Sequence, residues 1–321
     1  MEEMVIVSDY AGEIFAKKLA NRLMCQYVPV EIKYFSDGEP DIELMDNIRN
    51  RDAYYICPYF PNPMRRDSEI KFVNSTLRYS SAEKVIDVPT YLGFMKKDWK
   101  DRARVPISIR EVSVTMEPYA DRVVTIDMHS PQIQGMFRIP LDHLDGSVLF
   151  ADHIRENHEL SDIIITSTDI GGAKRAKKLA ERVGTREVAI VYKMRDPRTG
   201  DVTAEEVIGN VDGKKVIFID DQAITLDSIC EATKLVKEKG AKEVYAYCTH
   251  GLMVQKKGIT AEKRIADSLV EKLYITDTIP RNDSYFEENL KVGLISCVEL
   301  FAKALTKIHK GEPLSALFKT T

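Results

Sequence analysis

Short apolar runs alternate with amphipathic segments along the whole chain, and this alternation restricts the fold more than any other feature of the sequence. Runs with the length and β-branched composition of buried strands cover Met4–Ser8, Val30–Phe35, Ala53–Pro58, Lys84–Pro89, Arg122–Asp127, Asp162–Ser167, Val188–Lys193, Lys215–Asp220, Glu243–Thr249, Lys272–Thr276 and Val292–Ser296. The clearest helical patterns cover Ala11–Cys25, Asp67–Ser80, Gly172–Val183, Ser228–Lys239 and Cys297–Lys310. Strands and helices in alternation predict the α/β class, with mostly parallel sheets that carry helices on both faces.

The number of predicted strands favours two domains. A single open sheet of about eleven strands would be unusually large, whereas two sheets of about five strands are common. The polar stretch Pro140–Gly146 contains Pro and Gly between patterned segments, and it predicts the boundary. We therefore expect an N-terminal domain over residues 1–145 and a C-terminal domain over residues 146–321.

Composition and charge exclude several classes of partner. The net charge of −4 over 321 residues gives no reason to expect a nucleic-acid or acidic-membrane partner, since both favour basic surfaces. No apolar run approaches the roughly 18 residues that span a bilayer, and the acidic start MEEMVIVSDYAGE lacks the pattern of a secretory signal. The five scattered cysteines include no CxxC pair, which indicates reduced thiols. These features predict a cytoplasmic protein.

Residues able to bind ligands gather at predicted strand ends. In open α/β sheets, ligands bind beyond the carboxyl ends of the strands. Carboxylates at that edge suit ribose hydroxyls or Mg²⁺, and paired cations suit a transferring phosphoryl group. The pattern therefore predicts a sugar-phosphate site. The residues concerned are Asp127 with His129, Asp169 with Gly171 and Gly172, Lys193 with Arg195, and Asp220 with Asp221.

Each of these motifs also has a structural interpretation that spacing alone leaves open. Ser228 and Glu231 have the spacing of a capping box, which would start a helix that Gly240 ends. The segment Lys193–Val207 has the composition of a solvated loop, and His129 is open between a ligand and an ordinary surface histidine. The basic residues after the Gly-Gly pair are expected on a solvated helix face; they are Lys174, Arg175, Lys177 and Lys178.

Taken together, the ordered motifs resemble the ribose-phosphate pyrophosphokinase family over nearly the whole chain. The segments that carry the resemblance are FSDGE (Phe35–Glu39), RVPIS (Arg104–Ser108), ADRVVTIDMHSPQIQGMFRIPLDHL (Ala120–Leu144), DIGGAKRAKKLAERVG (Asp169–Gly184), KMR (Lys193–Arg195), FIDD (Phe218–Asp221), GAKEVYAYCTHGL (Gly240–Leu252), TDTIP (Thr276–Pro280) and IHKGEPLSALF (Ile308–Phe318). The resemblance implies two tandem phosphoribosyltransferase-like domains, the second with the acceptor-ribose site. It also implies a homo-oligomer, a dimer or hexamer, in which a neighbouring subunit completes the active site.

The resemblance further implies a reaction and a set of roles. The β,γ-pyrophosphate of MgATP would move to the anomeric 1-hydroxyl of a ribose 5-phosphate unit, with release of AMP. ATP would be bound by Phe35, Asp37, Glu39, Lys96, Lys97 and Asp98. Mg²⁺ and the phosphates would be held by His129 and Asp169, and catalysis would use His129, Lys193 and Arg195. The acceptor would be bound by Asp220, Asp221, Thr225 and Ser228.

Two positions depart from the family pattern. Lys96 and Lys97 stand where the family has an Arg-Gln pair, which removes the planar guanidinium. In the loop pattern D-D-x-x-D-T-x-G-T, Ile224 replaces the third acid and Asp227 replaces the glycine. A carboxylate about 5 Å from a phosphate would repel it by roughly 1–3 kcal/mol per charge pair.

The departures leave three hypotheses. The repulsion predicts an acceptor whose 5-phosphate is substituted and carries less charge, such as ADP-ribose, which would give ADP-ribose pyrophosphate. The alternatives are an ordinary enzyme that makes phosphoribosyl pyrophosphate from ribose 5-phosphate, or a catalytically silent paralogue that regulates true synthetase subunits. The third expects loss of residues at the transferring centre, yet the acids and cations named above all remain.

Overall fold

Two seven-stranded sheets organise the chain. The structure is a computed structural model that describes residues 3–195 and 202–317, with only the backbone described for 193–195, 202–205 and Ala316. The chain divides into two compact units. Unit 1 comprises the described residues through Asp145, Thr278–Arg281, and those from Cys297 onward, and unit 2 comprises Gly146–Asp277 and Asn282–Ser296. The predicted C-terminal domain ran to residue 321, whereas the last helix belongs to unit 1.

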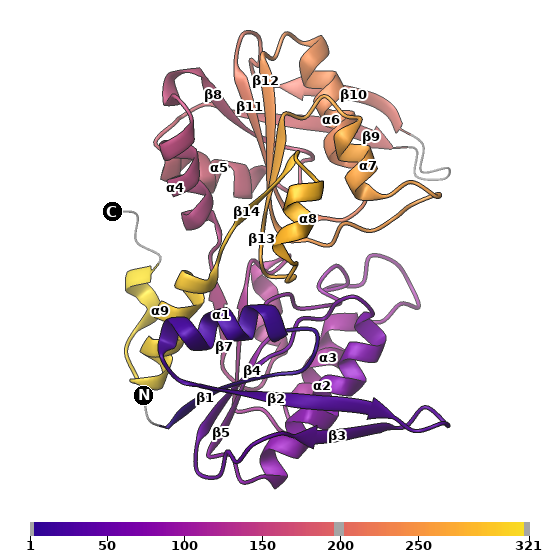
Figure 1. The fold of residues 1–321 in the computed structure, drawn as a ribbon. Helices are drawn as coiled ribbons and strands as arrows, with labels where there is room; N and C mark the ends of the chain where they lie inside the picture. The colour runs from indigo at the N-terminus through magenta and orange to yellow at the C-terminus, as the bar shows by residue number, and fades with distance from the viewer. Residues whose placement is uncertain (1–2, 196–201, 318–321) are drawn as a thin grey trace. The chain divides into compact units, whose positions relative to one another are not determined.

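Unit 1 is built on a mixed sheet with helices on both faces (Figure 1). In spatial order its strands are β3 (Pro40–Leu44), β2 (Gln26–Tyr34), β1 (Met4–Ser8), β4 (Asp52–Ile56), β5 (Lys84–Val88), β6 (Arg122–Ile126) and β7 (Leu141–Leu144). The helices are α1 (Glu13–Leu23), α2 (Pro63–Tyr79), α3 (Ser108–Met116) and α9 (Val298–His309), with short 3₁₀ turns at Pro131–Met136 and Leu314–Leu317. Helix α9 packs on α1, where the Phe15 and Phe301 rings meet edge to face at 5.4 Å.

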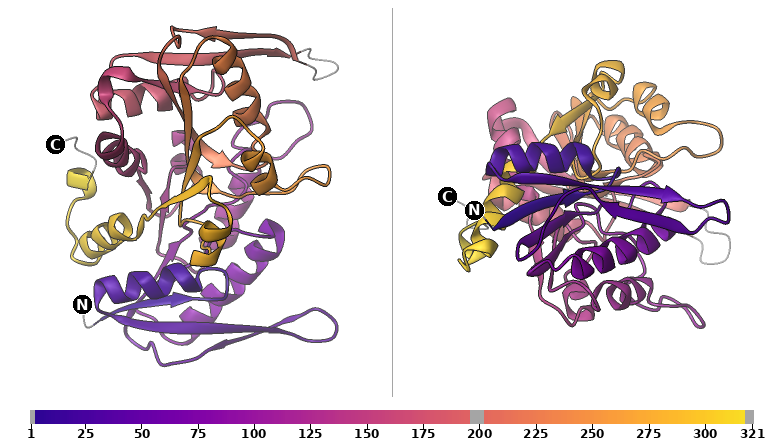
Figure 2. Two further views of the ribbon diagram at one scale, coloured as in Figure 1. Left: turned by 45° about the horizontal axis from the view of Figure 1, so that its top comes forward. Right: turned by 60° about the horizontal axis from the view of Figure 1, so that its bottom comes forward.

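Unit 2 repeats the same plan (Figure 2). Its strands in spatial order are β10 (Val202–Ile208), β9 (Val188–Arg195), β8 (Ile163–Ser167), β11 (Lys215–Ala223), β12 (Glu243–Gly251), β13 (Lys272–Thr276) and β14 (Val292–Ile295). The helices are α4 (Ser147–Asn157), α5 (Ala173–Val183), α6 (Asp227–Glu238), α7 (Ala261–Ala266) and α8 (Asp283–Glu288), with a 3₁₀ turn at Leu160–Asp162.

The apolar strand run before the paired acids is explained by burial on both faces. Ile217 and Ile219 pack in the cluster with α4 and α5, whereas Val216 and Phe218 pack in the cluster with α6 and α7. A strand covered on both faces has no polar side, so its sequence is a continuous apolar segment.

The architecture confirms the predicted α/β class. None of the helices in the described part of the chain has the length and hydrophobicity that crossing a bilayer requires.

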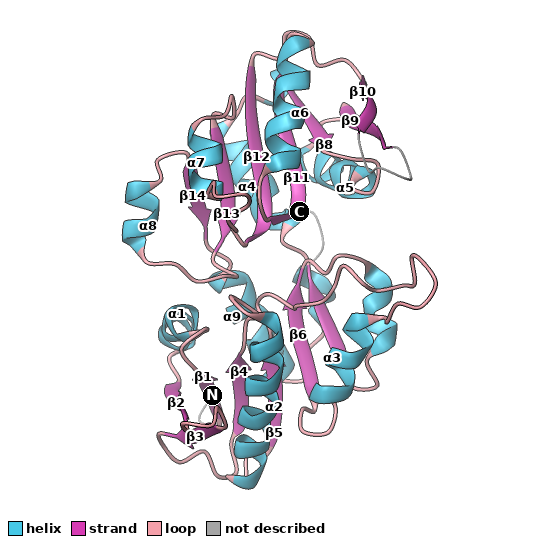
Figure 3. Cartoon of the chain, turned by 90° about the vertical axis from the view of Figure 1, so that its right-hand side faces the viewer, coloured by secondary structure: helices cyan, strands magenta, loops and turns pink. Residues whose placement is uncertain are grey.

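The two sheets have seven strands each, not the five expected. The missed strands are β3, β7 and β10, and each lies at the edge of its sheet. Figure 3 shows β3 beside β2 and β10 beside β9. An edge strand is half exposed and short, so it lacks the apolar pattern that identifies a central strand. Strand β7 lies inside Pro140–Gly146, the stretch predicted as the domain boundary, and directly before the break between the two units.

The equivalence of the two sheets locates their ligand edges. Strands β1 and β4 occupy the same central places in unit 1 as β8 and β11 do in unit 2. In both units the chain order reverses at this pair, and such a switch point is where open α/β sheets bind ligands. Gly12 and Gly172 begin the helices there, and a Cβ on either would lie 2.4 Å from a neighbouring oxygen.

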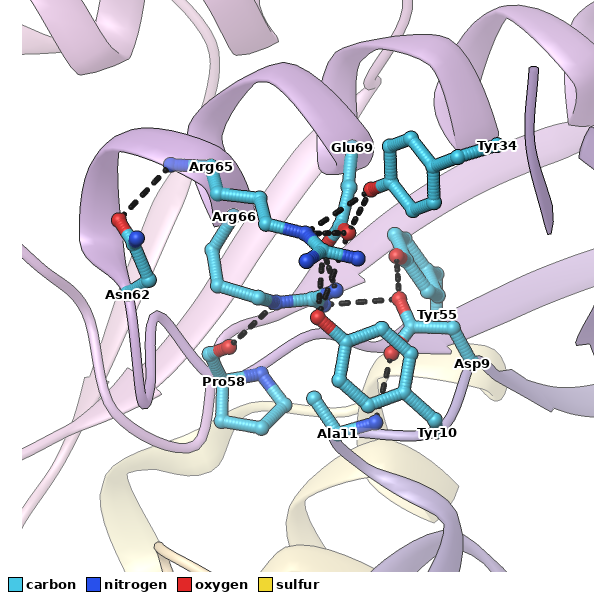
Figure 4. Close-up of polar contacts among 10 residues, drawn as sticks. All are labelled: Asp9, Tyr10, Ala11, Tyr34, Tyr55, Pro58, Asn62, Arg65, Arg66 and Glu69. Atoms are coloured by element: carbon cyan, nitrogen blue, oxygen red, sulfur yellow. Dashed lines mark hydrogen bonds and ion pairs between the residues drawn. The ribbon is translucent and has the colours of Figure 1, made fainter. Parts of the chain in front are cut away.

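In unit 1 this edge is filled by a buried ionic cluster on Arg66 (Figure 4). The guanidinium contacts Asp9 Oδ2 at 2.7 Å and Glu69 Oε2 at 2.6 Å, and Nε donates to Pro58 O at 3.1 Å. Tyr55 donates its hydroxyl proton to the same carboxylate of Asp9. Arg65 Nε also lies 2.8 Å from Glu69 Oε1, so two arginines match the two carboxylates. Because the Arg66 and Asp9 side chains are both 0% exposed, the cluster belongs to the core.

Asp87 on β5 is a buried carboxyl group with one hydrogen bond, from Asn74 Nδ2 at 2.7 Å. Burial raises the pKa of Asp87 to about 7, from a usual value of 3.8. The folded state therefore holds the proton while the unfolded state loses it, so stability falls as the pH rises from about 4 to 7. The difference between the two pKa values corresponds to about 4 kcal/mol.

We expect Asp87→Asn to stabilise the protein, by a margin that is about 2–3 kcal/mol larger at pH 8 than at pH 5. The amide keeps the shape and the hydrogen bond but cannot ionise. Urea unfolding of both proteins at the two pH values measures the difference. Asp152→Asn is the control, since that side chain is 65% exposed. An equal gain at both pH values would show that folding does not raise the pKa of Asp87.

Candidate active site

The turn after strand β8 holds Asp169 at the carboxyl edge of the unit 2 sheet. The side chain is exposed, and its Oδ1 accepts a hydrogen bond from Gly172 N at 2.9 Å. The Ser167 hydroxyl donates to Asp169 O at 2.5 Å and closes the turn. A Cβ at position 172 would lie 2.4 Å from Ser167 Oγ, so any other residue there would displace the hydroxyl from its hydrogen bond to Asp169 O. The turn therefore presents an exposed carboxylate directly before α5.

The paired acids at the end of β11 are bridged by Arg175. Its Nη1 lies 3.2 Å from Asp220 Oδ1 and 3.4 Å from Asp221 Oδ1. From the turn just after the neighbouring strand β8, Thr168 Oγ1 donates to Asp220 Oδ2 at 3.3 Å. The expectation that Arg175 lies on a solvated face is wrong, since the side chain turns to β11 and is 25% exposed. Arg175 lies in the first turn of a helix that starts at the ligand edge, and this position could have predicted a contact with the acids there.

Burial raises the pKa of Asp220, and the adjacent Asp221 carboxylate raises it further, whereas Arg175 acts in the opposite direction. The side chain of Asp220 is partly exposed and that of Asp221 is buried. Carboxylate oxygens at an open sheet edge can accept hydrogen bonds from two neighbouring hydroxyls. The arrangement therefore suits the 2- and 3-hydroxyls of a ribose.

The loop from Ala223 to Ser228 differs from the sequence expectation at Asp227. The carboxylate is not left to repel an anion, because Lys256 Nζ lies 2.5 Å from Oδ2 and Arg264 Nε lies 3.0 Å from Oδ1. Its pKa is lowered, first by the hydrogen bond from Lys256. The predicted repulsion of a phosphate is therefore wrong. The cluster of Asp227, Lys256 and Arg264 has two cations and one carboxylate, so its net charge attracts an anion. Lys256 and Arg264 were missed because they lie far along the chain.

Helix α6 begins one residue earlier than predicted. Its N-cap is Leu226 in a left-handed conformation with φ 64°, and no side chain caps it. Asp227 and Ser228 occupy the first two helical positions, so the predicted capping box is wrong. Thr225 donates its hydroxyl to Asp227 Oδ2 at 3.1 Å, and Ser228 is exposed. Gly240 follows the helix end with φ 92°, as predicted.

The loop that carries His129 has a fixed shape in unit 1. Strand β6 ends at Ile126, and Asp127 takes a left-handed backbone with φ 42°. His129 therefore does not continue the strand, and its side chain is exposed. Asp98 is 5% exposed and accepts hydrogen bonds from Ser130 and, at 3.0 Å, from Gln132 Nε2. This carboxylate holds the loop in place.

The remaining residues predicted to bind ATP are also in unit 1. Phe35 is 56% exposed in the hairpin between β2 and β3. The hairpin is closed by hydrogen bonds from Phe35 N to Glu39 O at 2.9 Å and from Glu39 N to Asp37 Oδ1 at 3.1 Å. Lys96 is exposed, and Lys97 pairs with Asp101 at 2.5 Å.

The two predicted catalytic cations lie on strand β9, which pairs with β8. The backbone of Lys193 and Arg195 is described, whereas their side chains lie outside the described part of the structure. Strand β9 pairs with β10 in the same antiparallel manner as β2 pairs with β3.

The donor atoms in unit 2 fit Mg²⁺ bound together with a substrate. Among the described residues, no group of three or more His, Cys, Asp or Glu side chains is placed to hold a metal by itself. Mg²⁺ usually keeps several waters and is bound by one or two carboxylates plus substrate phosphates. The exposed carboxylate of Asp169 meets that requirement.

Comparison with known proteins agrees with this geometry. Residues 4–118 match the N-terminal domain of ribose phosphate pyrophosphokinase, and residues 203–319 match the phosphoribosyl synthetase-associated domain. A ribose-phosphate pyrophosphokinase of Cereibacter sphaeroides is 35% identical, with 100% of this chain and 96% of the relative covered. The chain belongs to the ribose-phosphate pyrophosphokinase family. It is therefore a transferase of the pyrophosphokinase class, which uses ATP and Mg²⁺.

Other members of the ribose-phosphate pyrophosphokinase family agree in extent and structure. The relative from Campylobacter jejuni is 35% identical, with 98% of each chain covered. The crystal structure of phosphoribosylpyrophosphate synthetase from Mycobacterium smegmatis matches with a TM-score of 0.87 and 26% identity, over 97% of this chain and 100% of that one. This match confirms the prediction of two tandem phosphoribosyltransferase-like domains.

Proposed function

We propose that this chain transfers the β,γ-pyrophosphate of MgATP to the 1-hydroxyl of ribose 5-phosphate, releasing AMP and forming phosphoribosyl pyrophosphate. The observation that carries the choice of acceptor is the pairing of Asp227 with Lys256 and Arg264. A dianionic phosphate meets a cluster with a net positive charge there, so a less charged acceptor is no longer required. The family membership supports the same reaction.

The proposed roles follow the positions of the side chains. Asp220 and Asp221 accept hydrogen bonds from the ribose hydroxyls, and Arg175 keeps the two carboxylates together. Lys193 and Arg195 close over the pyrophosphate and stabilise the charge that develops on its oxygens. Asp169 holds Mg²⁺, with His129 at the phosphates. Mg²⁺, when bound, neutralises charge on the phosphate oxygens.

The other proposed roles concern ATP. Phe35 is exposed at the tip of the β2–β3 hairpin, where its ring can stack on adenine. Asp37 and Glu39 supply acceptors for the ribose of ATP, and Lys96 and Lys97 supply positive charge. Asp98 acts by holding the loop that carries His129. Thr225 and Ser228 contribute hydroxyls at the start of α6.

ADP-ribose was the acceptor that the sequence favoured, and the argument for it assumed an unpaired carboxylate at Asp227. That assumption does not hold in the structure. A silent regulatory paralogue is disfavoured by the retained paired acids and by their organised contacts with Arg175 and Thr168. Ribose 5-phosphate is thus the acceptor we propose.

The experiment that tests this function follows AMP release from MgATP with ribose 5-phosphate and with ADP-ribose in parallel. We expect AMP with ribose 5-phosphate at a kcat/KM well above that with ADP-ribose. AMP with ADP-ribose alone would overturn the proposed acceptor. No AMP with either, together with co-purification with an active homologue, would favour the regulatory hypothesis.

We further propose a cytoplasmic homo-oligomer, a dimer or hexamer. The support is the resemblance to a family in which a neighbouring subunit completes the active site, together with five cysteines that are all free. Light scattering of the purified protein measures the oligomer. A monomer with full activity would contradict the shared site.

A further inference from the structure

We propose that Lys256 is the side chain that binds the 5-phosphate of the acceptor, and that Asp227 and Arg264 position it. The proposal rests on the function proposed above and assigns a specificity-determining residue to the same site. Lys256 lies in the segment between β12 and α7, which turns back through a bridge between Lys256 and Ile259. It reaches the start of α6 from more than 25 residues along the chain.

The positions of the three side chains are fixed by one another. Asp227 Oδ2 accepts from Lys256 Nζ at 2.5 Å, and Oδ1 faces Arg264 Nε at 3.0 Å. Arg264 Nη1 donates to Thr225 O at 2.8 Å, and Nη2 contacts Lys256 O at 3.5 Å. The guanidinium therefore joins the 223–228 loop to the segment that carries Lys256.

The two cations, Lys256 and Arg264, differ in whether their hydrogen-bond donors remain accessible to a ligand. Arg264 is 16% exposed, and its donors face the protein. Lys256 is 50% exposed. An ammonium group has three donors, so a contact with one carboxylate oxygen leaves donors for a phosphate. Since two cations surround one carboxylate, the cluster carries a net charge of about +1 and attracts a dianion.

The backbone of the 223–228 loop also favours the binding of an anion. Its carbonyl oxygens face the segment that follows β12, with Ala223 O accepting from Met253 N at 2.9 Å and Ile224 O from Val254 N at 2.7 Å. Thr225 O accepts from Arg264. Carbonyl groups would repel a phosphate, and here they are turned to protein donors. The first N–H groups of α6 have no acceptor within the helix, so they are suited to an anion.

A buried acceptor beside the loop also points to a hydroxyl-bearing ligand. Gln222 directly follows the paired acids and is 9% exposed. Its Oε1 is buried without a hydrogen-bond partner among the described residues. A buried unsatisfied oxygen is rare in folded proteins and is explained here if a sugar hydroxyl donates to it. The paired acids and Gln222 thus supply acceptors on the strand that leads into the 223–228 loop.

This arrangement explains how the chain tolerates Asp227 in place of glycine. A glycine loop would bind the phosphate by close approach of the backbone. Here a side-chain pair replaces part of that contact: Asp227 anchors an ammonium group, and the ammonium group contacts the phosphate. The carboxylate is a positioning residue, and it acts on the substrate through Lys256.

The first test compares Lys256→Ala with Lys257→Ala, its exposed neighbour in the same segment. We expect Lys256→Ala to raise KM for ribose 5-phosphate by roughly 10- to 100-fold, with kcat changed less than about threefold and KM for MgATP unchanged, because the contact is the same in ground and transition states. Lys257→Ala should match the parent, and Lys256→Arg should recover most of the affinity. Equal KM values for the two alanine variants would overturn the proposal.

The second test separates positioning from repulsion. If Asp227 positions Lys256, Asp227→Asn leaves the KM for ribose 5-phosphate unchanged or raises it by up to about tenfold. If the carboxylate instead repels the substrate, Asp227→Asn lowers KM, and the proposal fails. Calorimetry with ribose 5-phosphate should show the same ranking without turnover. An inactive parent enzyme would contradict the proposed function, whereas an active parent with an unaffected Lys256→Ala variant would contradict this inference alone.

Discussion

We expect the Lys193→Ala variant to lose roughly 10³-fold in kcat with MgATP and ribose 5-phosphate. Pyrophosphoryl transfer needs little covalent help from the protein, because the reacting oxygen and phosphorus have only to be held in line. The main demand is charge compensation on the transferring group. Lys193 lies on β9, beside the β8 strand that leads to Asp169, and is the cation we assign to that task. A loss of this size corresponds to about 4 kcal/mol of transition-state stabilisation.

The control variant for Lys193 is Lys177→Ala, since that lysine is on α5 with a side chain that is 75% exposed. It should retain parental turnover. Single-turnover measurement of AMP at saturating substrates reports kcat directly, and the thermal unfolding of both variants should match that of the parent. If Lys193→Ala keeps kcat within about threefold, another group must stabilise the transition state.

The second large effect is expected at Arg66, where Arg66→Met should lower the free energy of unfolding by about 3–5 kcal/mol. Methionine fills much of the volume but leaves the buried Asp9 carboxylate without a cation and Glu69 with Arg65 alone. Both carboxylates are at most 2% exposed. The loss therefore comes from the stranded charge of Asp9 more than from the missing contacts.

Urea unfolding of Arg66→Met and Arg65→Met makes the comparison, because both arginines contact Glu69 but the Arg65 side chain is 51% exposed. We expect less than about 1 kcal/mol for Arg65→Met. Adding Asp9→Asn to Arg66→Met should restore part of the stability, since it removes the stranded charge. Equal losses for the two single variants would show that burial is not what makes Arg66 important.

The sequence was sufficient for the central strands and the longer helices. Their signal is local, because a strand buried on both faces is apolar throughout, as in Val216–Ile219. It was insufficient for the edge strands β3, β7 and β10, which are short or half exposed and so resemble loops. The placement of α9 was also beyond it, since packing on α1 depends on contacts between the two ends of the chain.

The same distinction applies to the candidate site. The acids at strand ends could be identified from position, because the carboxyl edge of a parallel sheet follows from the strand order. The charge of Asp227 could be identified, but its environment could not. Its partners Lys256 and Arg264 follow β12 in the sequence and contact Asp227 only in the folded chain. The residues around Asp227 in the sequence do not predict these contacts. The effect of a charge depends on its neighbours in space, so the predicted acceptor changed once those neighbours were known.

The most direct test of the account is ³¹P NMR of the purified protein with MgATP and ribose 5-phosphate. We predict that AMP and a sugar with a new pyrophosphate on its 1-hydroxyl appear in equal amounts, while the 5-phosphate signal persists as a monoester. Formation of ADP, or an unchanged spectrum under conditions in which the protein is folded, would contradict it.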